Sequence, residues 1–90
     1  MHSFLSDGIE IAYIDEGEGE PIILVHGFAS NVVFNWIVPG WVSYLTRAGY
    51  RVGALDNRGH GESQTLHDLA DYSAPIMAGA VLRLSDHLSI

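Results

Sequence analysis

The chain has 90 residues, no cysteine and a formal net charge of −7, and 48% of its residues are hydrophobic. So acidic a chain repels polyphosphate, which argues against nucleic-acid and anionic-membrane partners. The apolar fraction is too high for a disordered tail, and the lack of cysteine excludes disulfide scaffolds, thiolate zinc sites and thiol catalysis. No apolar run approaches the roughly 18 residues that span a bilayer, and no basic signal segment is present, so we expect a globular, cytoplasmic protein.

The first predicted elements form a β-hairpin. Residues 8–14 alternate with a period of two, which is typical of a partly buried strand. The preceding Asp7-Gly8 favours a tight turn, so residues 3–5 are expected to pair with this strand. The acidic, glycine-punctuated residues 15–20 are expected to form a solvated loop, since their spacing does not match a calcium loop. One face of the strand carries Ile9, Ile11 and Tyr13, and the other carries Glu10, Ala12 and Ile14.

A strand, a helix and a second strand come next. Residues 22–25 are consecutive apolar residues, which is typical of a strand buried on both faces, and residues 51–55 form the second strand. Between them, a helix over about residues 41–48 is expected to end at Gly49, because Pro39-Gly40 breaks any earlier helix. The two strands are therefore predicted to be parallel, since parallel strands need such a crossover. The residues at helical spacing are Trp41, Tyr44, Leu45 and Ala48.

A last helix is predicted near the end of the chain. Ser73 is expected to cap it, and Pro75 is tolerated in the first turn. The helix is expected to end near residues 87–90. Its apolar stripe consists of Ile76, Met77, Ala80, Val81, Leu84 and Leu88.

Two motifs follow the two apolar strands. The run His26-Gly27-Phe28-Ala29-Ser30 follows the first, and residues 56–63, with the sequence DNRGHGES, follow the second. Together they resemble the N-terminal part of an α/β-hydrolase of the esterase and lipase type. The resemblance covers essentially all of residues 1–90. It implies an α/β fold with an incomplete sheet: a hairpin, two parallel strands with a crossover helix, and a C-terminal helix, within one domain.

The resemblance assigns the first motif to the oxyanion hole. An acyl-transfer enzyme stabilises the negative charge that forms after attack, and fixed backbone N–H donors do so without reorganising. The resemblance makes the Phe28 N–H such a donor and places its ring near the acyl pocket. The substrate contacts expected from it are His26, Gly27, Phe28 and Trp36. The alternative is that His26-Gly27 merely ends a strand. Phe34, Trp36, Trp41 and Tyr44 are expected to be core residues or walls of the substrate cleft.

The second motif is expected to be structural. Gly59 and Gly61 permit a sharp turn, and Arg58 with Asp56 are expected to tie the loop together, with Ser63 in the same motif. A dinucleotide-binding role is rejected, because the third glycine of that pattern falls at Gln64. His2, His60, His67 and His87 show no metal-ligand spacing and are expected on surfaces or loops. We predict no metal and no cofactor.

The chemistry that the family implies is not complete in this sequence. No G-x-S-x-G elbow occurs, neither Ser30 nor Ser63 is a credible nucleophile, and none of the five histidines matches the catalytic one. We therefore expect a fragment that is inactive alone. The resemblance also implies that the strand at residues 22–25 has an unpaired edge, a template for association.

Three functions remain open. The first is a serine hydrolase acting on a carboxylic ester, lactone or similar small acyl compound through an acyl-enzyme. The second is a relative with an Asp nucleophile, such as a dehalogenase or an epoxide hydrolase. Epoxide hydrolases typically show His-Gly-x-Pro, and Ala29 stands where that proline would be. The third is a non-catalytic module that associates through its open sheet edge.

Overall fold

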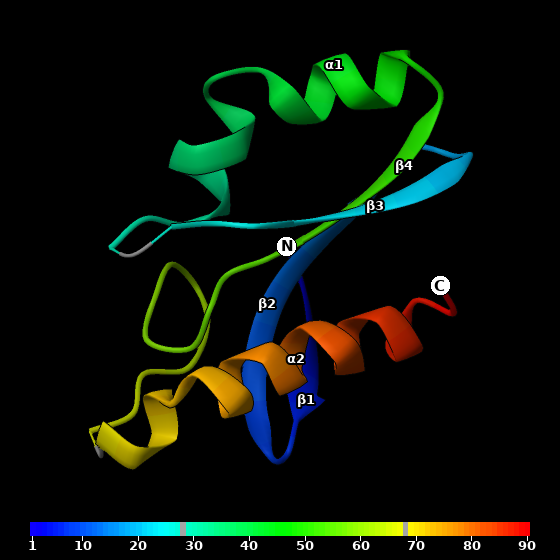
Figure 1. The fold of residues 1–90 in the computed structure, drawn as a ribbon. Coiled ribbons are helices and arrows are strands. Elements are labelled where there is room, and N and C mark those ends of the chain that lie inside the picture. The colour runs from blue at the N-terminus through cyan, green and yellow to red at the C-terminus, as the bar shows by residue number, and fades with distance from the viewer. Residues whose placement is uncertain (28, 68) are drawn as a thin grey trace.

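A computed structural model describes residues 1–27, 29–67 and 69–90. A four-stranded sheet in the order β1-β2-β4-β3 lies between two helical layers (Figure 1). Across the described ranges, no helix has the length and apolar character needed to cross a bilayer. The elements are β1 (His2–Ser6), β2 (Ile9–Glu16), β3 (Glu20–Val25), the π-helical turn η1 (Val33–Ile37), α1 (Trp41–Arg47), β4 (Tyr50–Leu55), the 3-10 turn η2 (Leu69–Tyr72) and α2 (Ala74–His87).

The predicted hairpin is confirmed. β1 and β2 pair antiparallel, and the turn between them places both Asp7 and Gly8 at positive φ, 52° and 81°. Both angles belong to the mirror-image turn that matches the twist of paired strands.

The expected solvated loop at residues 15–20 is wrong in part. Asp15 and Glu16 end β2 and pair with β4, because β4 offers them a ladder partner, so the turn itself is short.

The two parallel strands are also confirmed. β3 pairs with β4 in parallel register from Glu20 opposite Tyr50 to Val25 opposite Leu55, and η1 and α1 form the crossover. The expectation that β3 is buried on both faces is wrong. Its residues 22–24 are half-buried and Val25 is 44% exposed, because β3 lies at the edge of the sheet. β4 is the internal parallel strand, and its residues 52–55 are buried.

The sheet has a core on each face. α2 covers one face and α1 with η1 covers the other (Figure 1). The alternation of β2 divides its residues between these cores, as expected from its period of two. The core under α2 contains Phe4, Ile11, Tyr13, Leu55, Ala80, Leu84 and Leu88. The core under α1 contains Ile14, Val32, Val42, Val52 and Ala54.

α1 faces the core with part of its apolar residues only. The helix buries Val42 and packs Leu45 against the core, whereas Trp41 and Tyr44 are 51% and 64% exposed. Trp41 and Tyr44 are therefore not core residues, and the alternative that they are walls of the substrate cleft stays a prediction.

α2 begins and packs as its sequence indicates. Ser73 occupies the N-cap position, although its side chain makes no capping hydrogen bond; its carbonyl accepts from Met77 N. Ala80, Leu84 and Leu88 of the predicted stripe are buried, and Ile76 at its start is 37% exposed.

Arg51 connects three elements at the far end of the sheet from the two motifs. Its guanidinium donates to both carboxylate oxygens of Asp15 at 2.9 Å, in a paired geometry, and to Leu88 O at 3.1 Å. The arginine of β4 thereby holds the end of β2 and the C-terminal end of α2 together. Such two-pronged contacts are stronger than single ones.

This ion pair is expected to make stability depend on pH under acid conditions. The hydrogen bond from Arg51 lowers the pKa of Asp15 below its ordinary value of 3.8, despite an opposing effect of burial. Because the folded-state pKa lies below the unfolded one, the carboxylate stabilises the fold above the unfolded value, and this contribution is lost as the pH falls through the folded value. Asp15→Asn should reduce the fall in the free energy of unfolding between about pH 5 and pH 2, measured with urea. An unchanged fall would contradict this role.

Candidate functional site

The two motifs meet at one end of the sheet, beyond the carboxyl ends of β3 and β4. They follow β3 and β4, and parallel strands present their carboxyl ends on the same side, which is where open α/β sheets bind ligands. Between the two loops and the start of α2 lies a hollow of about 660 Å³, here called the loop depression. It is lined by Ala29, Ser30, Asn31, Gly59, His60, Gly61, Tyr72 and Met77.

His26 joins the two loops. Its side chain is 5% exposed, its Nδ1 lies 2.8 Å from Gly27 O, and its Nε2 accepts from Asn57 N at 2.9 Å. The second bond makes Nε2 an acceptor, so the proton belongs on Nδ1, which donates to Gly27 O. The neutral ring thus positions both backbones. Direct contact of His26 with a substrate stays a prediction.

His60 makes the reciprocal connection from the second loop. Its Nε2 accepts from Ala29 N at 3.2 Å and its Nδ1 lies 3.0 Å from Arg58 O. The rings of His26 and His60 lie 5.1 Å apart between centroids. His60 was expected to be an ordinary loop residue, because one histidine in a glycine-rich run carries no signal of a partner 31 residues earlier in the chain.

The loop after β3 turns sharply. Ser30 N donates to Gly27 O at 3.2 Å, and Ala29 has a φ of 58°, in the left-handed region. Alanine adopts that region at a cost of about 1 kcal/mol or more, so the surrounding hydrogen bonds must hold it there. Phe28, the predicted oxyanion donor, lies outside the described residues, so its role stays a prediction.

η1 also holds the loop after β3 through a side-chain hydrogen bond. Asn35 Oδ1 accepts from Gly27 N at 3.0 Å, and Asn31 Oδ1 accepts from Phe34 N at 2.9 Å at the start of the turn. Phe34 itself is 69% exposed, so it is not a core residue, and the alternative that it is a wall of the substrate cleft stays a prediction. Trp36 packs against the core under α1 and does not line the loop depression, so its predicted substrate contact stays a prediction.

Asp56 is the buried anchor of the second loop. Its carboxylate is 1% exposed and accepts from Val32 N at 2.8 Å and from Glu62 N at 3.0 Å. One oxygen therefore holds the start of η1 and the other closes its own loop. Asp56 thus ties the motif together through backbone amides. Arg58 is also buried, 3% exposed, and its predicted contact with Asp56 stays a prediction.

Ser63 and the two glycines complete this loop. Ser63 Oγ donates to Asp56 O at 2.5 Å and accepts from Ala12 N at 2.8 Å, which fixes the loop to β2. Gly59 and Gly61 both have positive φ, 75° and 52°. A Cβ at Gly59 would lie 2.7 Å from Tyr72 Oη, and one at Gly61 would overlap the Asp56 carboxylate.

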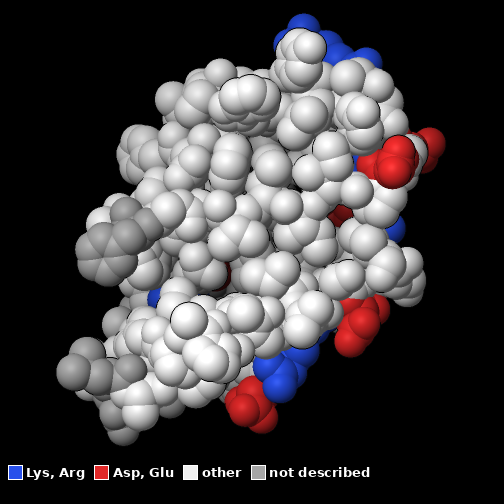
Figure 2. All heavy atoms as spheres, viewed as in Figure 1, with Lys and Arg blue, Asp and Glu red and all other residues white. Residues whose placement is uncertain are grey.

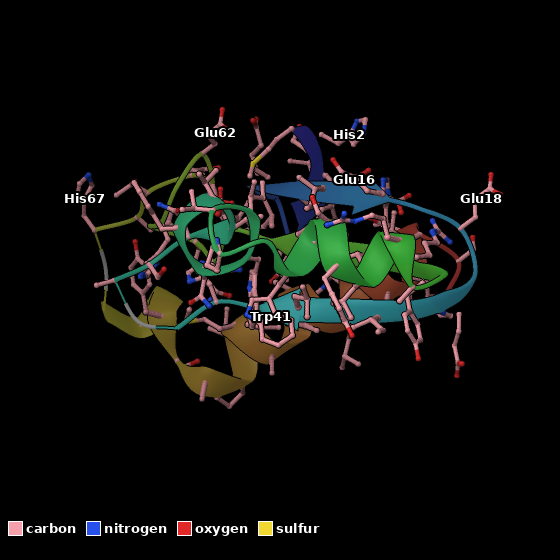
Figure 3. The ribbon with its side chains drawn as sticks, turned by 90° about the horizontal axis from the view of Figure 1, so that it is seen from above. His2, Glu16, Glu18, Trp41, Glu62 and His67 are labelled. Carbon is pink, nitrogen blue, oxygen red and sulfur yellow. The ribbon has the colours of Figure 1, made fainter. Side chains whose placement is uncertain are left out.

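The site therefore consists mainly of backbone held by side-chain acceptors. Figure 3 shows the two loops together at the end of the sheet opposite Glu16 and Glu18. Within the described ranges, no group of three or more His, Asp or Glu side chains could hold a metal ion. Preorganised backbone of this kind suits the binding of developing negative charge, since it needs no rearrangement during reaction.

The contact between Gly61 and Asp56 gives a stability prediction. Gly61→Ala adds left-handed strain and displaces the carboxylate that holds Val32 and Glu62, so it should lower the free energy of unfolding by more than about 2 kcal/mol. Gly40→Ala is the matched control: its φ is 92° and a Cβ there meets nothing within 4 Å. That control should cost only about 1 kcal/mol in the same urea titration. Equal losses for the two variants would contradict the role of Asp56.

Ala29 gives a second prediction. Ala29→Gly should change the free energy of unfolding by less than about 1 kcal/mol, because relief of the positive φ offsets the added freedom of the unfolded chain. Ala29→Pro should cost at least about 2 kcal/mol, because proline fixes φ near −65° and removes the N–H that His60 accepts. Thermal melting of both variants tests this, and a well-tolerated proline would show that the left-handed turn is not required.

Comparison with known proteins supports the fold. The model of the alpha/beta hydrolase fold family matches residues 20–90. A non-heme haloperoxidase of Rhodococcus erythropolis is 41% identical over 76 residues, which cover 81% of this chain and 27% of that protein. Bifunctional epoxide hydrolase 2 of Mus musculus is 29% identical over 83 residues, covering 92% of this chain and 14% of that protein.

Solved structures agree. The crystal structure of an epoxide hydrolase from Vigna radiata matches with a TM-score of 0.88 at 25% identity, covering 99% of this chain and 28% of that chain. An esterase from Exiguobacterium antarcticum matches with a TM-score of 0.86 at 27% identity, covering 100% of this chain and 32% of that chain. The chain spans less than a third of each of these relatives. On the extent of the family match and the agreement of the fold, the chain belongs to the alpha/beta hydrolase fold family.

Proposed function

We propose that this chain supplies the oxyanion-binding loop of a hydrolase acting on a carboxylic ester, lactone or similar small acyl compound through an acyl-enzyme. The observation that carries the proposal is the loop after β3. Its backbone is held by His26, His60 and Asn35, beside a depression at the carboxyl ends of parallel strands. A loop that is fixed in this way before substrate arrives suits stabilisation of an oxyanion.

In the proposed reaction, a nucleophile attacks the substrate carbonyl and its oxygen becomes negatively charged. The N–H of residue 28 would donate to that oxygen, and the imidazoles would keep the loop from collapsing onto the charge. Nε2 of each ring accepts a backbone N–H, which assigns the proton to Nδ1 beside a backbone carbonyl, so we assign both rings a positioning role. The sequence contains no G-x-S-x-G elbow, so the nucleophile and its general base would come from polypeptide other than these 90 residues.

The second candidate is a hydrolase with an Asp nucleophile. The similarity to epoxide hydrolases, in sequence and in structure, favours it. Ala29 argues against an epoxide substrate. Its φ of 58° is an angle that proline cannot adopt, so the His-Gly-x-Pro pattern does not fit this turn. The similarity to an esterase supports the acyl substrate.

A chimeric enzyme tests the oxyanion role. Residues 1–90 would replace the matching segment of the Exiguobacterium antarcticum esterase, and hydrolysis of a p-nitrophenyl ester would be measured. Phe28→Pro, which removes the N–H, should lower kcat by about 10²–10³. Phe28→Leu is the matched control, since it changes the ring and keeps the N–H, so its kcat should fall far less.

Two outcomes would decide against the proposal. Equal losses of kcat for the two variants, with both chimeras folded by circular dichroism, would remove the backbone donor from the mechanism. The nucleophile is identified separately by reading the gene past the codon for Ile90. A serine at the centre of the elbow supports the acyl-enzyme, and an aspartate there supports the second candidate.

A further inference from the structure

Two imidazoles join the loops that follow β3 and β4, and each accepts a hydrogen bond from the backbone of the other loop. His26 Nε2 accepts from Asn57 N at 2.9 Å, and His60 Nε2 accepts from Ala29 N at 3.2 Å. The centroids of the two rings lie 5.1 Å apart. These two bonds are here called the imidazole latch. Each joins residues that are 31 apart in the sequence, so together they hold one loop against the other.

The imidazole latch requires both rings to be neutral. A neutral imidazole has one acceptor nitrogen, whereas an imidazolium has two donors and no acceptor. A proton added to Nε2 of either ring would face a backbone N–H, so the hydrogen bond would be lost. His26 has little freedom to avoid this conflict, since its side chain is 5% exposed. Two imidazolium rings with centroids 5.1 Å apart would also repel each other.

The ionisable groups described around the imidazole latch come from the second loop and from η2. Asp56 is 1% exposed and Arg58 is 3% exposed, so a buried negative charge and a buried positive charge in the same loop act on the rings in opposite directions. Tyr72 lines the loop depression. Glu62 and His67 are exposed, and Figure 3 shows both pointing away from the body of the molecule.

The other segments beside the imidazole latch carry no ionisable side chain. This holds for residues 27–40, which include η1, and for residues 73–82 at the start of α2. Figure 2 shows the acidic side chains of this face mostly at its margins. The Asp56 carboxylate is itself engaged by the amides of Val32 and Glu62. The hydrogen-bond pattern of the two rings therefore decides which protonation state fits the imidazole latch.

We propose that the imidazole latch makes the proposed oxyanion loop sensitive to acid, because protonation of His26 and His60 releases the loop after β3 from the loop after β4. The effect on catalysis rests on the proposed function, whereas the release itself does not. Ala29 is affected most, since the bond to His60 helps to hold its φ of 58° against strain. As the pH falls through the range in which imidazoles titrate, about pH 7 to pH 5, the neutral rings and the closed arrangement are lost together, and both return on neutralisation.

Amide hydrogen exchange of the 90-residue chain, resolved by nuclear magnetic resonance, tests the release without an enzyme assay. Protection factors, corrected for the intrinsic effect of pH, are measured at about pH 7.5 and about pH 5. Those of Ala29 and Asn57 should fall by about tenfold or more at the lower pH, because each amide loses its acceptor. Ala12 N is the internal control, since it donates at 2.8 Å to the Ser63 hydroxyl, which gains no charge at either pH. Its protection should stay within about twofold.

Two matched variants separate the contributions of the rings. Glutamine places an amide oxygen where Nε2 lies, and that oxygen accepts a hydrogen bond at either pH. In His60→Gln, the protection of Ala29 should therefore become independent of pH while that of Asn57 still falls. His26→Gln should show the reverse. Circular dichroism checks that both variants fold.

Nitrogen chemical shifts of the rings keep the test decisive if the buried His26→Gln variant does not fold. At about pH 7.5 they should show Nδ1 protonated and Nε2 unprotonated in both rings of the unaltered chain. A proton on Nε2 overturns the proposal, and so does protection of Ala29 and Asn57 that is the same at both pH values. A His60→Gln chain in which Ala29 keeps its full pH dependence also overturns it. The chimeric esterase decides the oxyanion role separately, since its readout depends on the N–H of residue 28 and not on the imidazole latch.

Discussion

The loop after β3 depends on side chains that accept hydrogen bonds from backbone amides. Asn35 holds Gly27 N, His60 holds Ala29 N and Asp56 holds Val32 N, while His26 holds Asn57 N in the opposite direction. Three of these four bonds join segments more than 20 residues apart. The shape of the candidate site therefore rests on contacts between two loops, each of which would lack its conformation without the other.

These contacts are possible only because β3 and β4 lie side by side and parallel. Their common register brings His26 and Asp56 to the same end of the sheet, because these residues directly follow the two strands. The two helical layers cover the faces, and Arg51 fixes the opposite end through Asp15 and Leu88 O. The sheet thus holds the two loops in place beside the loop depression.

Local signals in the sequence predicted much of this fold. Asp7-Gly8 predicted the hairpin, the apolar runs predicted β3 and β4, and Pro39-Gly40 placed the start of α1. What could not be predicted depends on partners distant in the chain. Asp15 belongs to a strand because β4 pairs with it, and α1 turns Val42 inward because of the core that it meets. The contact between His26 and His60 also has no local signal, since His60 alone is typical of an ordinary loop histidine and nothing near His26 in the sequence indicates a partner 34 residues later.

The two loops account for only part of the chemistry that a hydrolase needs. Side-chain hydrogen bonds hold the backbone of the two loops, but the sequence has no G-x-S-x-G elbow to supply the nucleophile. The chain covers less than a third of the relatives that it matches, and its β3 edge is open to a further strand.

Hydrogen exchange of individual amides, followed by nuclear magnetic resonance, tests the central claim most directly. The amides of Gly27, Ala29, Val32 and Asn57 should exchange far more slowly than in an unfolded chain, and those of Val32 and Glu62 should lose protection in Asp56→Ala while the β2 and β4 amides keep theirs. If the loop amides exchanged at unfolded-chain rates beside a protected sheet, the loops would not be held by these side chains, and the account of a preorganised site would be wrong.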